Sequence, residues 1–127
     1  MKRLFPVTAK AVLFNSDKSK VLLIHMDRRD AWVLPGGHID EGETPDETMV
    51  REIYEECGVT STDLRHVDFF MHSEGKIILA YVGTVREGEL KSPQNNLEGV
   101  SKWITKDEFD TLDDIEDVYR KVINENW

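Results

Sequence analysis

Glu52, Glu55 and Glu56 form a cluster of carboxylates in the middle of the sequence. If this segment is helical, their i, i+3 and i+4 spacing places all three side chains on one side of the helix. Like charges at this spacing destabilise a helix by about 0.2–0.5 kcal/mol per pair, so helix stability does not explain the cluster. A hard divalent cation such as Mg²⁺ or Mn²⁺ prefers carboxylate oxygens and would neutralise the charges. The spacing therefore indicates a metal site, and the alternative interpretation is an acidic helix face exposed to solvent.

The residues around this cluster predict a helix over about 45–57. Thr44 is a favourable N-cap, Pro45 suits the first helical position, and Glu47 completes a capping box with Thr44. Gly58 supplies the left-handed residue that commonly follows a helix. On a helical wheel one narrow sector is apolar and is expected to face the core: Met49, Val50, Ile53 and Cys57.

Segments with the period of strands flank this helix on both sides. Pro35, Gly36 and Gly37 predict a turn between a strand and the helix. We expect strands over residues 7–14, 21–24, 32–34, 64–71, 76–85 and 100–104, a short capped helix after Thr105, and a terminal helix that includes Ile115, Val118, Tyr119 and Val122. This order of elements predicts an α/β fold with a mixed β-sheet and helices on its faces.

Composition and charge narrow the class of protein. A length of 127 residues with 39% hydrophobic residues predicts one domain over 1–127. The formal net charge of −9 argues against a nucleic-acid or membrane partner, so a cation would have to mediate contact with phosphate. Cys57, the one cysteine, is expected to be a reduced, buried thiol. No export signal is visible and no apolar segment reaches the roughly 20 residues of a membrane-spanning helix, so we expect a cytoplasmic protein.

Gly37, Glu43 and the segment from Arg51 to Val59 resemble the Nudix box at every specified position. Five residues separate Gly37 from Glu43, and seven separate Glu43 from Arg51. This resemblance implies the Nudix fold, an α/β/α sandwich around a mixed β-sheet. It also implies hydrolysis of a nucleoside diphosphate linked to another moiety. The implied cofactor is Mg²⁺, with Mn²⁺ as a substitute, and the implied partners are a small-molecule nucleotide and a second copy of the chain in a homodimer.

The same resemblance implies a metal site with a catalytic carboxylate. Glu52 and Glu56 match metal ligands of the family, and Glu55 matches a further metal-binding or catalytic glutamate. Gly37 matches a glycine whose backbone carbonyl completes the metal shell, although it could simply be a turn glycine. Glu98 matches a recurrent extra ligand or base, with an ordinary loop acid as the alternative. The general base is therefore expected to be Glu52 or Glu98.

Two further residues of the box are expected to support this site. Arg51 matches the arginine that orients a catalytic glutamate, a task for which its planar fork is well suited. An i, i+4 ion pair with Glu47 or Glu55 is an alternative that does not exclude the first role. Glu43 matches the isolated glutamate of the box, which organises the loop or contacts the metal through water.

Residues outside the box bear on the substrate. Glu74 stands where ADP-ribose-directed members carry a proline, and Gly75, Lys76 and Ile77 stand where dinucleoside polyphosphate hydrolases carry a tyrosine. These differences favour a nucleoside triphosphate or a modified nucleotide, cleaved to a monophosphate and pyrophosphate by attack of water on phosphorus. Candidate substrate contacts are three rings that could stack on a base, or else belong to the core: Trp32, Phe70 and His72. Arg28 or Arg29 could steer phosphate.

Other functions stay open at this stage. Within enzymes the alternatives are hydrolysis of ADP-ribose, a sugar nucleotide or another diphosphate. Outside enzymes the alternative is a non-catalytic nucleotide-binding module with the Nudix fold. The complete set of box glutamates favours the enzyme.

Overall fold

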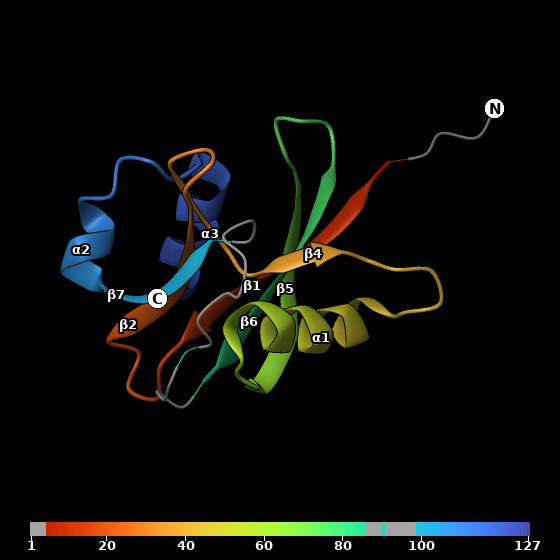
Figure 1. Cartoon of the computed structure of the whole chain (residues 1–127), viewed down its shortest axis with the longest axis horizontal. Helices are drawn as coiled ribbons and strands as arrows, with labels where there is room; N and C mark the ends of the chain where they lie inside the picture. Colours follow the sequence, from red (N-terminus) through yellow and green to blue (C-terminus); the bar gives the residue numbers. More distant parts are fainter. Residues whose placement is uncertain (1–4, 86–89, 91–98) are drawn as a thin grey trace.

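The structure is a computed structural model, described here for residues 5–85, 90 and 99–127 (Figure 1). The elements follow in the order β1 (Val7–Phe14), β2 (Lys20–Met26), β3 (Ala31–Val33), β4 (Gly36–His38), α1 (Pro45–Cys57), β5 (Thr62–Met71), β6 (Ile77–Thr84), β7 (Val100–Thr105), α2 (Lys106–Asp110) and α3 (Asp117–Asn126). Each strand and helix expected from the sequence is present, with ends that differ by a few residues. Ile115, expected in the terminal helix, lies before α3 and forms a β-bridge with Trp32.

One mixed sheet organises the described part of the chain. Its main path runs in the order β3-β2-β1-β6-β5, while β4 pairs with β1 and β7 pairs with β2. Strands β1 and β6 are parallel from Val7, opposite Ile77, to Phe14, opposite Thr84. All the other pairs are antiparallel. The predicted mixed sheet is therefore confirmed.

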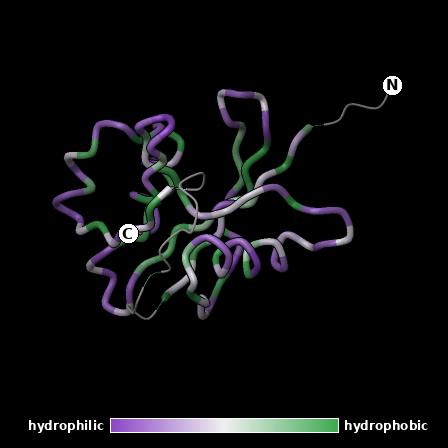
Figure 2. The backbone as a smooth tube through the Cα atoms, viewed as in Figure 1, coloured by the Kyte–Doolittle hydropathy of each residue, from purple (hydrophilic) through white to green (hydrophobic). Residues whose placement is uncertain are grey.

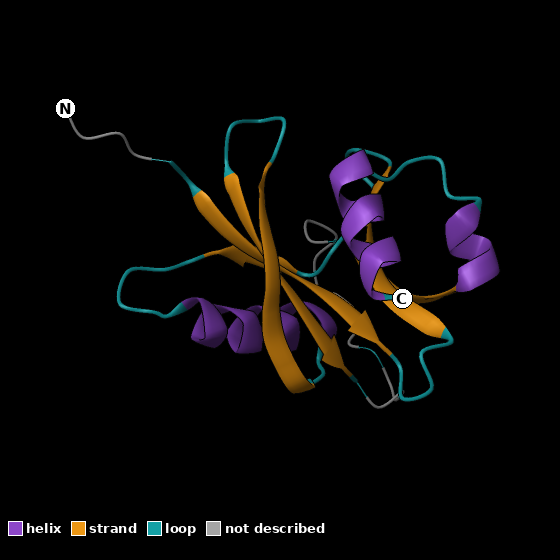
Figure 3. Cartoon of the chain, turned by 180° about the vertical axis from the view of Figure 1, so that it is seen from behind, coloured by secondary structure: helices purple, strands orange, loops and turns teal. Residues whose placement is uncertain are grey.

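Helices cover both faces of this sheet. Alternate residues of β1 point to opposite faces, so Ala9, Ala11 and Leu13 pack in a core with α1. Val12 and Phe14 pack in a second core, with α2 and α3. Figure 1 shows α1 in front of β5 and β6, and Figure 3, drawn from behind, shows α3 on the opposite face. This layering is the α/β/α arrangement that the sequence predicts.

Apolar residues follow the strands that run through the centre of the molecule, and polar residues follow most of the connecting loops (Figure 2). No helix in the described ranges is long and apolar enough to cross a membrane. Cys57 is buried and free, as expected, and burial raises the pKa of its thiol to about 11.

The glycine segment before α1 differs from the expectation of a turn. Gly36 and Gly37 belong to β4, where Gly37 lies opposite Ala9 of β1. A Cβ at Gly36 would lie 2.0 Å from the carbonyl oxygen of Ala9, and Gly36 has a φ of +148°, so only glycine allows this approach. The backbone of the predicted turn is therefore held in the sheet.

The core face of α1 is narrower than expected. Met49, Ile53 and Cys57 are buried, but Val50 is 59% exposed. Val50 lies at the margin of the apolar sector, one helical turn before Tyr54, which is equally exposed. The expectation that Val50 faces the core is thus wrong, because the buried face of α1 extends from Met49 towards Thr48 and not towards Val50.

Candidate active site

The capping box fixes where α1 begins. The Thr44 side chain accepts a hydrogen bond from the Glu47 N–H at 3.2 Å, and the Glu47 carboxylate accepts one from the Thr44 N–H at 3.0 Å. At the other end Gly58, with a φ of +73°, donates its N–H to the Tyr54 carbonyl at 2.9 Å. The predicted helix and both its caps are confirmed, and they set the directions of the glutamates that follow.

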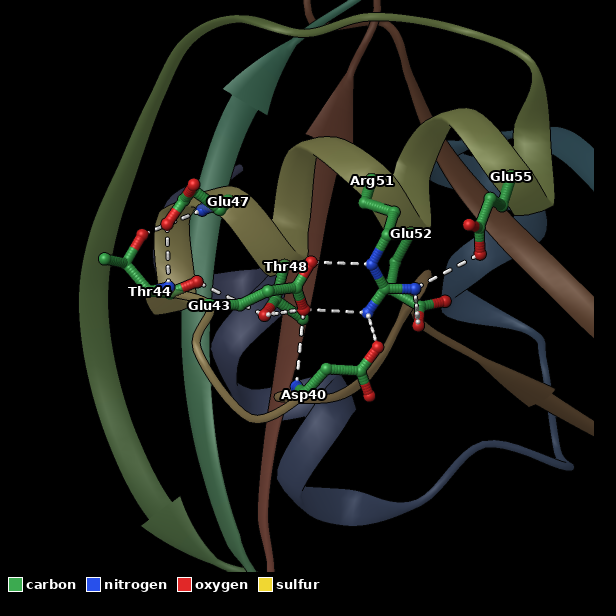
Figure 4. Close-up of polar contacts among 8 residues, drawn as sticks. All are labelled: Asp40, Glu43, Thr44, Glu47, Thr48, Arg51, Glu52 and Glu55. Carbon is green, nitrogen blue, oxygen red and sulfur yellow. Dashed lines mark hydrogen bonds and ion pairs between the residues drawn. The ribbon is translucent and has the colours of Figure 1, made fainter.

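Arg51 is the centre of the polar network on α1 (Figure 4). Its guanidinium donates two hydrogen bonds to Glu43, from Nε to Oε2 at 2.8 Å and from Nη2 to Oε1 at 3.0 Å. Nη1 donates to Glu52 at 3.0 Å and to Glu55 at 3.2 Å, and Nη2 forms an ion pair with Asp40 at 3.2 Å. The hydrogen bonds to Glu43 and the charges of Glu52 and Asp40 raise the pKa of Arg51. Arg51 in turn contacts two of the box glutamates, Glu52 and Glu55.

Glu43 is the most completely hydrogen-bonded carboxylate of this network. Besides Arg51, the Thr48 hydroxyl donates to it at 2.9 Å and the Asp40 N–H at 3.3 Å. The hydrogen bonds from Arg51 are the main reason that the pKa of Glu43 falls to about 2. Glu43 therefore joins the loop before α1 to the helix, which fits the supporting role expected of it.

Glu52 and Glu56 lie against the two glycines of β4. A Cβ at Gly37 would lie 2.6 Å from Oε1 of Glu52, so the missing side chain of Gly37 makes room for that carboxylate. Glu56 accepts a hydrogen bond from the Gly36 N–H at 2.8 Å. Glu52 and Glu56, one helical turn apart on α1, thus lie against neighbouring residues of β4.

The donors at this place suit a hard cation. The candidate ligands are carboxylate and backbone oxygens, which Mg²⁺ and Mn²⁺ prefer. In the described ranges no three His, Cys, Asp or Glu side chains are already gathered as a ligand group. Glu52, Glu56 and the backbone of Gly37 could supply part of a metal shell, and water or substrate oxygens would have to fill its remaining positions, as is usual for Mg²⁺.

The structure brings together five of the residues expected at the site: Gly37, Arg51, Glu52, Glu55 and Glu56. The expected i, i+4 pair of Arg51 is formed with Glu55 and not with Glu47, whose carboxylate is used in the capping box. Glu98 lies outside the described residues, so its role as ligand or base stays a prediction.

Three of the residues expected to bind substrate form no contact with the Arg51 network within the described part of the chain. Trp32, in β3, packs edge-to-face against His25 with ring centroids 4.8 Å apart. Phe70 is half-buried against the core that contains α3. Arg28 is exposed in the turn between β2 and β3. None of the three is therefore fixed in place by the carboxylate cluster.

His72 has a structural task instead of the stacking role expected from the sequence. Its side chain is 2% exposed, and Nε2 lies 2.5 Å from a Glu116 carboxylate oxygen. Nδ1 accepts a hydrogen bond from the Glu74 N–H at 3.1 Å. With both nitrogens engaged and the ring buried beside Tyr119, His72 joins the β5–β6 hairpin to α3 and offers no free face to a base.

Sequence reasoning missed three residues beside this site. Thr48 holds Glu43, and Asp40 holds Arg51, but neither belongs to the pattern of the box. Lys10 donates a hydrogen bond from Nζ to the Leu34 carbonyl at 3.1 Å, just before β4. In the sequence Lys10 is a charged residue between two alanines of an apolar strand. Because successive residues of a strand point to opposite faces, this position could be interpreted as facing solvent.

The NUDIX domain model matches residues 4–125. The chain belongs to the NUDIX domain family. The resemblance carried by the box is therefore confirmed over nearly the whole chain. Nudix hydrolases generally use divalent metal ions, in agreement with the oxygen donors of α1 and β4.

Individual Nudix proteins resemble the chain to different extents. RNA pyrophosphohydrolase of Photobacterium profundum is 57% identical over 35 residues, which is 28% of this chain and 20% of that protein. The match thus spans only a small part of that relative. A hydrolase of the NUDIX family from Clostridium perfringens has a TM-score of 0.83 at 22% identity, covering 97% of this chain and 96% of that chain.

The NUDIX domain of Shewanella oneidensis NrtR, solved in complex with ADP ribose, also has a TM-score of 0.83. It is 20% identical, and the match covers 98% of this chain and 87% of that chain. At such identities the likeness of both solved structures establishes the fold. The expected Nudix fold is therefore confirmed.

Proposed function

We propose that this protein is a metal-dependent hydrolase of a nucleoside diphosphate linked to another moiety, with a nucleoside triphosphate as its main substrate class. The observation that carries the proposal is the meeting of α1 and β4, where Glu52 lies against Gly37 and Glu56 accepts from the Gly36 N–H. A second support is the name pyrophosphohydrolase, borne by the relative that matches 28% of this chain.

The reaction adds water across one phosphoric anhydride bond. The water oxygen bonds to phosphorus, the bond to the bridging oxygen breaks, and a nucleoside monophosphate and pyrophosphate leave. Glu52, Glu56 and the Gly37 backbone would hold the metal, which when bound supplies positive charge to the diphosphate oxygens and to the attacking water. A carboxylate, Glu52 or Glu98, takes the proton of that water.

Arg51 and Glu55 support this chemistry without being required to touch the substrate. Arg51 holds Glu52 and Glu55 through one nitrogen, at 3.0 and 3.2 Å, while Glu43 fixes the other side of the guanidinium. A fork held in this way restricts the rotation of both glutamates. The proposed role of Arg51 is therefore positioning, and Glu55 is proposed as a further metal-binding or catalytic carboxylate.

The proposed partner is a small nucleotide. Two differences from other Nudix classes favour release of a monophosphate and pyrophosphate. Glu74 replaces the proline of ADP-ribose-directed members, and residues 75–77 lack the tyrosine of dinucleoside polyphosphate hydrolases. ADP-ribose is the second candidate, since a NUDIX domain of the same fold was solved with it. We propose Mg²⁺ as the metal and Mn²⁺ as its substitute.

Product analysis tests this function. The protein is incubated with Mg²⁺ and nucleoside triphosphates, canonical and oxidised, ADP-ribose, sugar nucleotides and dinucleoside polyphosphates. Wild type and Glu125→Gln, a control on α3, should release pyrophosphate from a triphosphate, whereas Glu56→Gln should lose most turnover. Cleavage of ADP-ribose alone would replace the proposed substrate class.

A thermal shift separates the metal assignment from catalysis. Millimolar Mg²⁺ should raise the melting temperature of wild type more than that of Glu52→Gln/Glu56→Gln, because an ion that binds the native state stabilises it. Equal shifts would place the metal elsewhere. Binding of a nucleotide without turnover, with Mg²⁺ or Mn²⁺, would favour the non-catalytic module.

A further inference from the structure

Lys10 is a cation placed inside the sheet. It lies between the buried residues Ala9 and Ala11 of β1, in the strand that pairs with both β4 and β6. Its register partners are Gly36 in β4 and Ala80 in β6, and Ala80 is itself buried. Position 10 therefore lies next to the strand that contacts the box glutamates.

The ammonium of Lys10 has few partners for a group in such a place. Nζ donates to the Leu34 carbonyl at 3.1 Å, and among the described residues it forms no ion pair with a carboxylate. An ammonium carries three N–H donors, so two are left for other acceptors. Lys10 is half-buried, and a neutral carbonyl compensates only part of the hydration that its charge loses.

Carboxylates of α1 and of the segment before α3 both influence the charge of Lys10. Burial and the charge of Lys76 lower the pKa of its amine, while Glu56, Glu52 and Glu116 favour the charged form. Glu116 borders a cavity of about 360 Å³ that is also lined by Ser73 and Ile115. The charges of the proposed metal carboxylates and of an acid at the rim of a cavity thus both favour a charged Lys10.

A partly desolvated cation without an ion-pair partner destabilises the native state unless an anion completes its surroundings. The substrates of the proposed function carry several negative charges, and their diphosphate must come to Glu52 and Glu56. We propose that Lys10 contacts the substrate, donating a hydrogen bond from its ammonium to a phosphate oxygen of the bound nucleotide. This inference rests on the proposed function and adds a residue that the box does not contain.

The test combines stability with binding in Lys10→Met, which keeps the length of the side chain and removes its charge. The probe is a non-hydrolysable α,β-methylene nucleoside triphosphate with Mg²⁺, and Lys121→Met, at an exposed position of α3, is the control. Without nucleotide, Lys10→Met should melt at or above the temperature of wild type, because an unpaired cation has been removed. Its affinity for the probe should fall about tenfold or more, and KM for a cleaved nucleotide should rise correspondingly.

A merely structural role predicts the opposite pattern. If Lys10 only holds the Leu34 carbonyl, Lys10→Met should melt at a lower temperature and bind the probe as wild type does, which would overturn the inference. Lys10→Arg keeps the charge and should retain affinity within about threefold of wild type; a loss as large as that of Lys10→Met would also overturn it. Should wild type itself neither bind nor cleave any nucleotide, the proposed function fails and this inference fails with it.

Discussion

Arg51 and Glu43 are joined by two parallel hydrogen bonds, from Nε to Oε2 at 2.8 Å and from Nη2 to Oε1 at 3.0 Å. This fork pairing spans the loop that leads into α1 and leaves Nη1 for Glu52 and Glu55. The loop, the first half of the helix and two of the box glutamates are therefore held by one guanidinium.

The pair makes stability depend on pH in a definite window. The pKa of Glu43 lies at about 2 in the folded protein, against an ordinary value of 4.5, because Arg51 donates to its carboxylate. Because this pKa is lower in the folded than in the unfolded protein, the ionised Glu43 carboxylate stabilises the native state at pH values above the unfolded pKa. This stabilisation is lost as pH falls from about 4.5 towards 2. The difference in unfolding free energy between wild type and Glu43→Gln should be constant above about pH 5 and shrink below it. Urea titrations between pH 2 and 7 measure this, and a difference independent of pH would contradict it.

Arg51→Lys should separate positioning from charge. A lysine keeps the positive charge but cannot form the fork with Glu43 or hold Glu52 and Glu55 through a second nitrogen. We expect kcat to fall by about tenfold to a hundredfold with a smaller change in KM, as for other residues that orient ligands. Arg65→Lys, on exposed β5, is the matched control and should leave both constants unchanged. A loss confined to KM would instead indicate direct substrate contact.

The two glycines of β4 should respond differently to alanine. At Gly37 the added Cβ meets the end of the Glu52 side chain, which can move, so the fold should tolerate Gly37→Ala while metal binding and turnover are lost. At Gly36 the Cβ meets the backbone of Ala9 at 2.0 Å, so Gly36→Ala should unfold the protein or lower its melting temperature severely. Circular dichroism melts and Mg²⁺-induced thermal shifts distinguish these outcomes. Equal melting temperatures for the two variants would refute the distinction.

Tyr81→Phe tests how β6 anchors the start of α1. Tyr81 is a buried residue whose hydroxyl donates to Asp46 at 2.5 Å, and burial together with Asp46 raises the pKa of that hydroxyl, so it remains a donor well above neutral pH. Loss of this hydrogen bond should lower the free energy of unfolding by about 1–2 kcal/mol. Tyr54→Phe, whose ring is 59% exposed, should change it little. Denaturant titration of both variants measures their free energies of unfolding. Equal losses in the two variants would show that the hydrogen bond to Asp46 does not anchor α1.

Local patterns were enough to predict α1 and its glutamates. Thr44, Glu47 and Gly58 are capping signals whose hydrogen bonds lie within one helix, so the sequence contains all that is needed to locate them. Since α1 also carries Arg51 and the box glutamates, most of the candidate site could be placed before any tertiary contact was known.

Features that depend on distant segments could not be predicted in this way. The pairing of Gly36 and Gly37 with β1, the burial of His72 against Glu116 and the exposure of Val50 all follow from which elements pack together. The position of Lys10 could not be predicted for the same reason, because the sequence of β1 does not show that β1 pairs with β4. These positions require the arrangement of the sheet and not only its strands.

The pairing of Ala9 with Gly37 also has a consequence for how the protein reaches its native state. Contacts between segments far apart in sequence form late, since the intervening chain must first lose its freedom. The isolated helix can present its glutamates early, but their oxygens meet the glycine strand only after β4 has docked on β1. Capture of the cation would thus be a late event in refolding, and metal uptake would report that the long-range part of the sheet is complete.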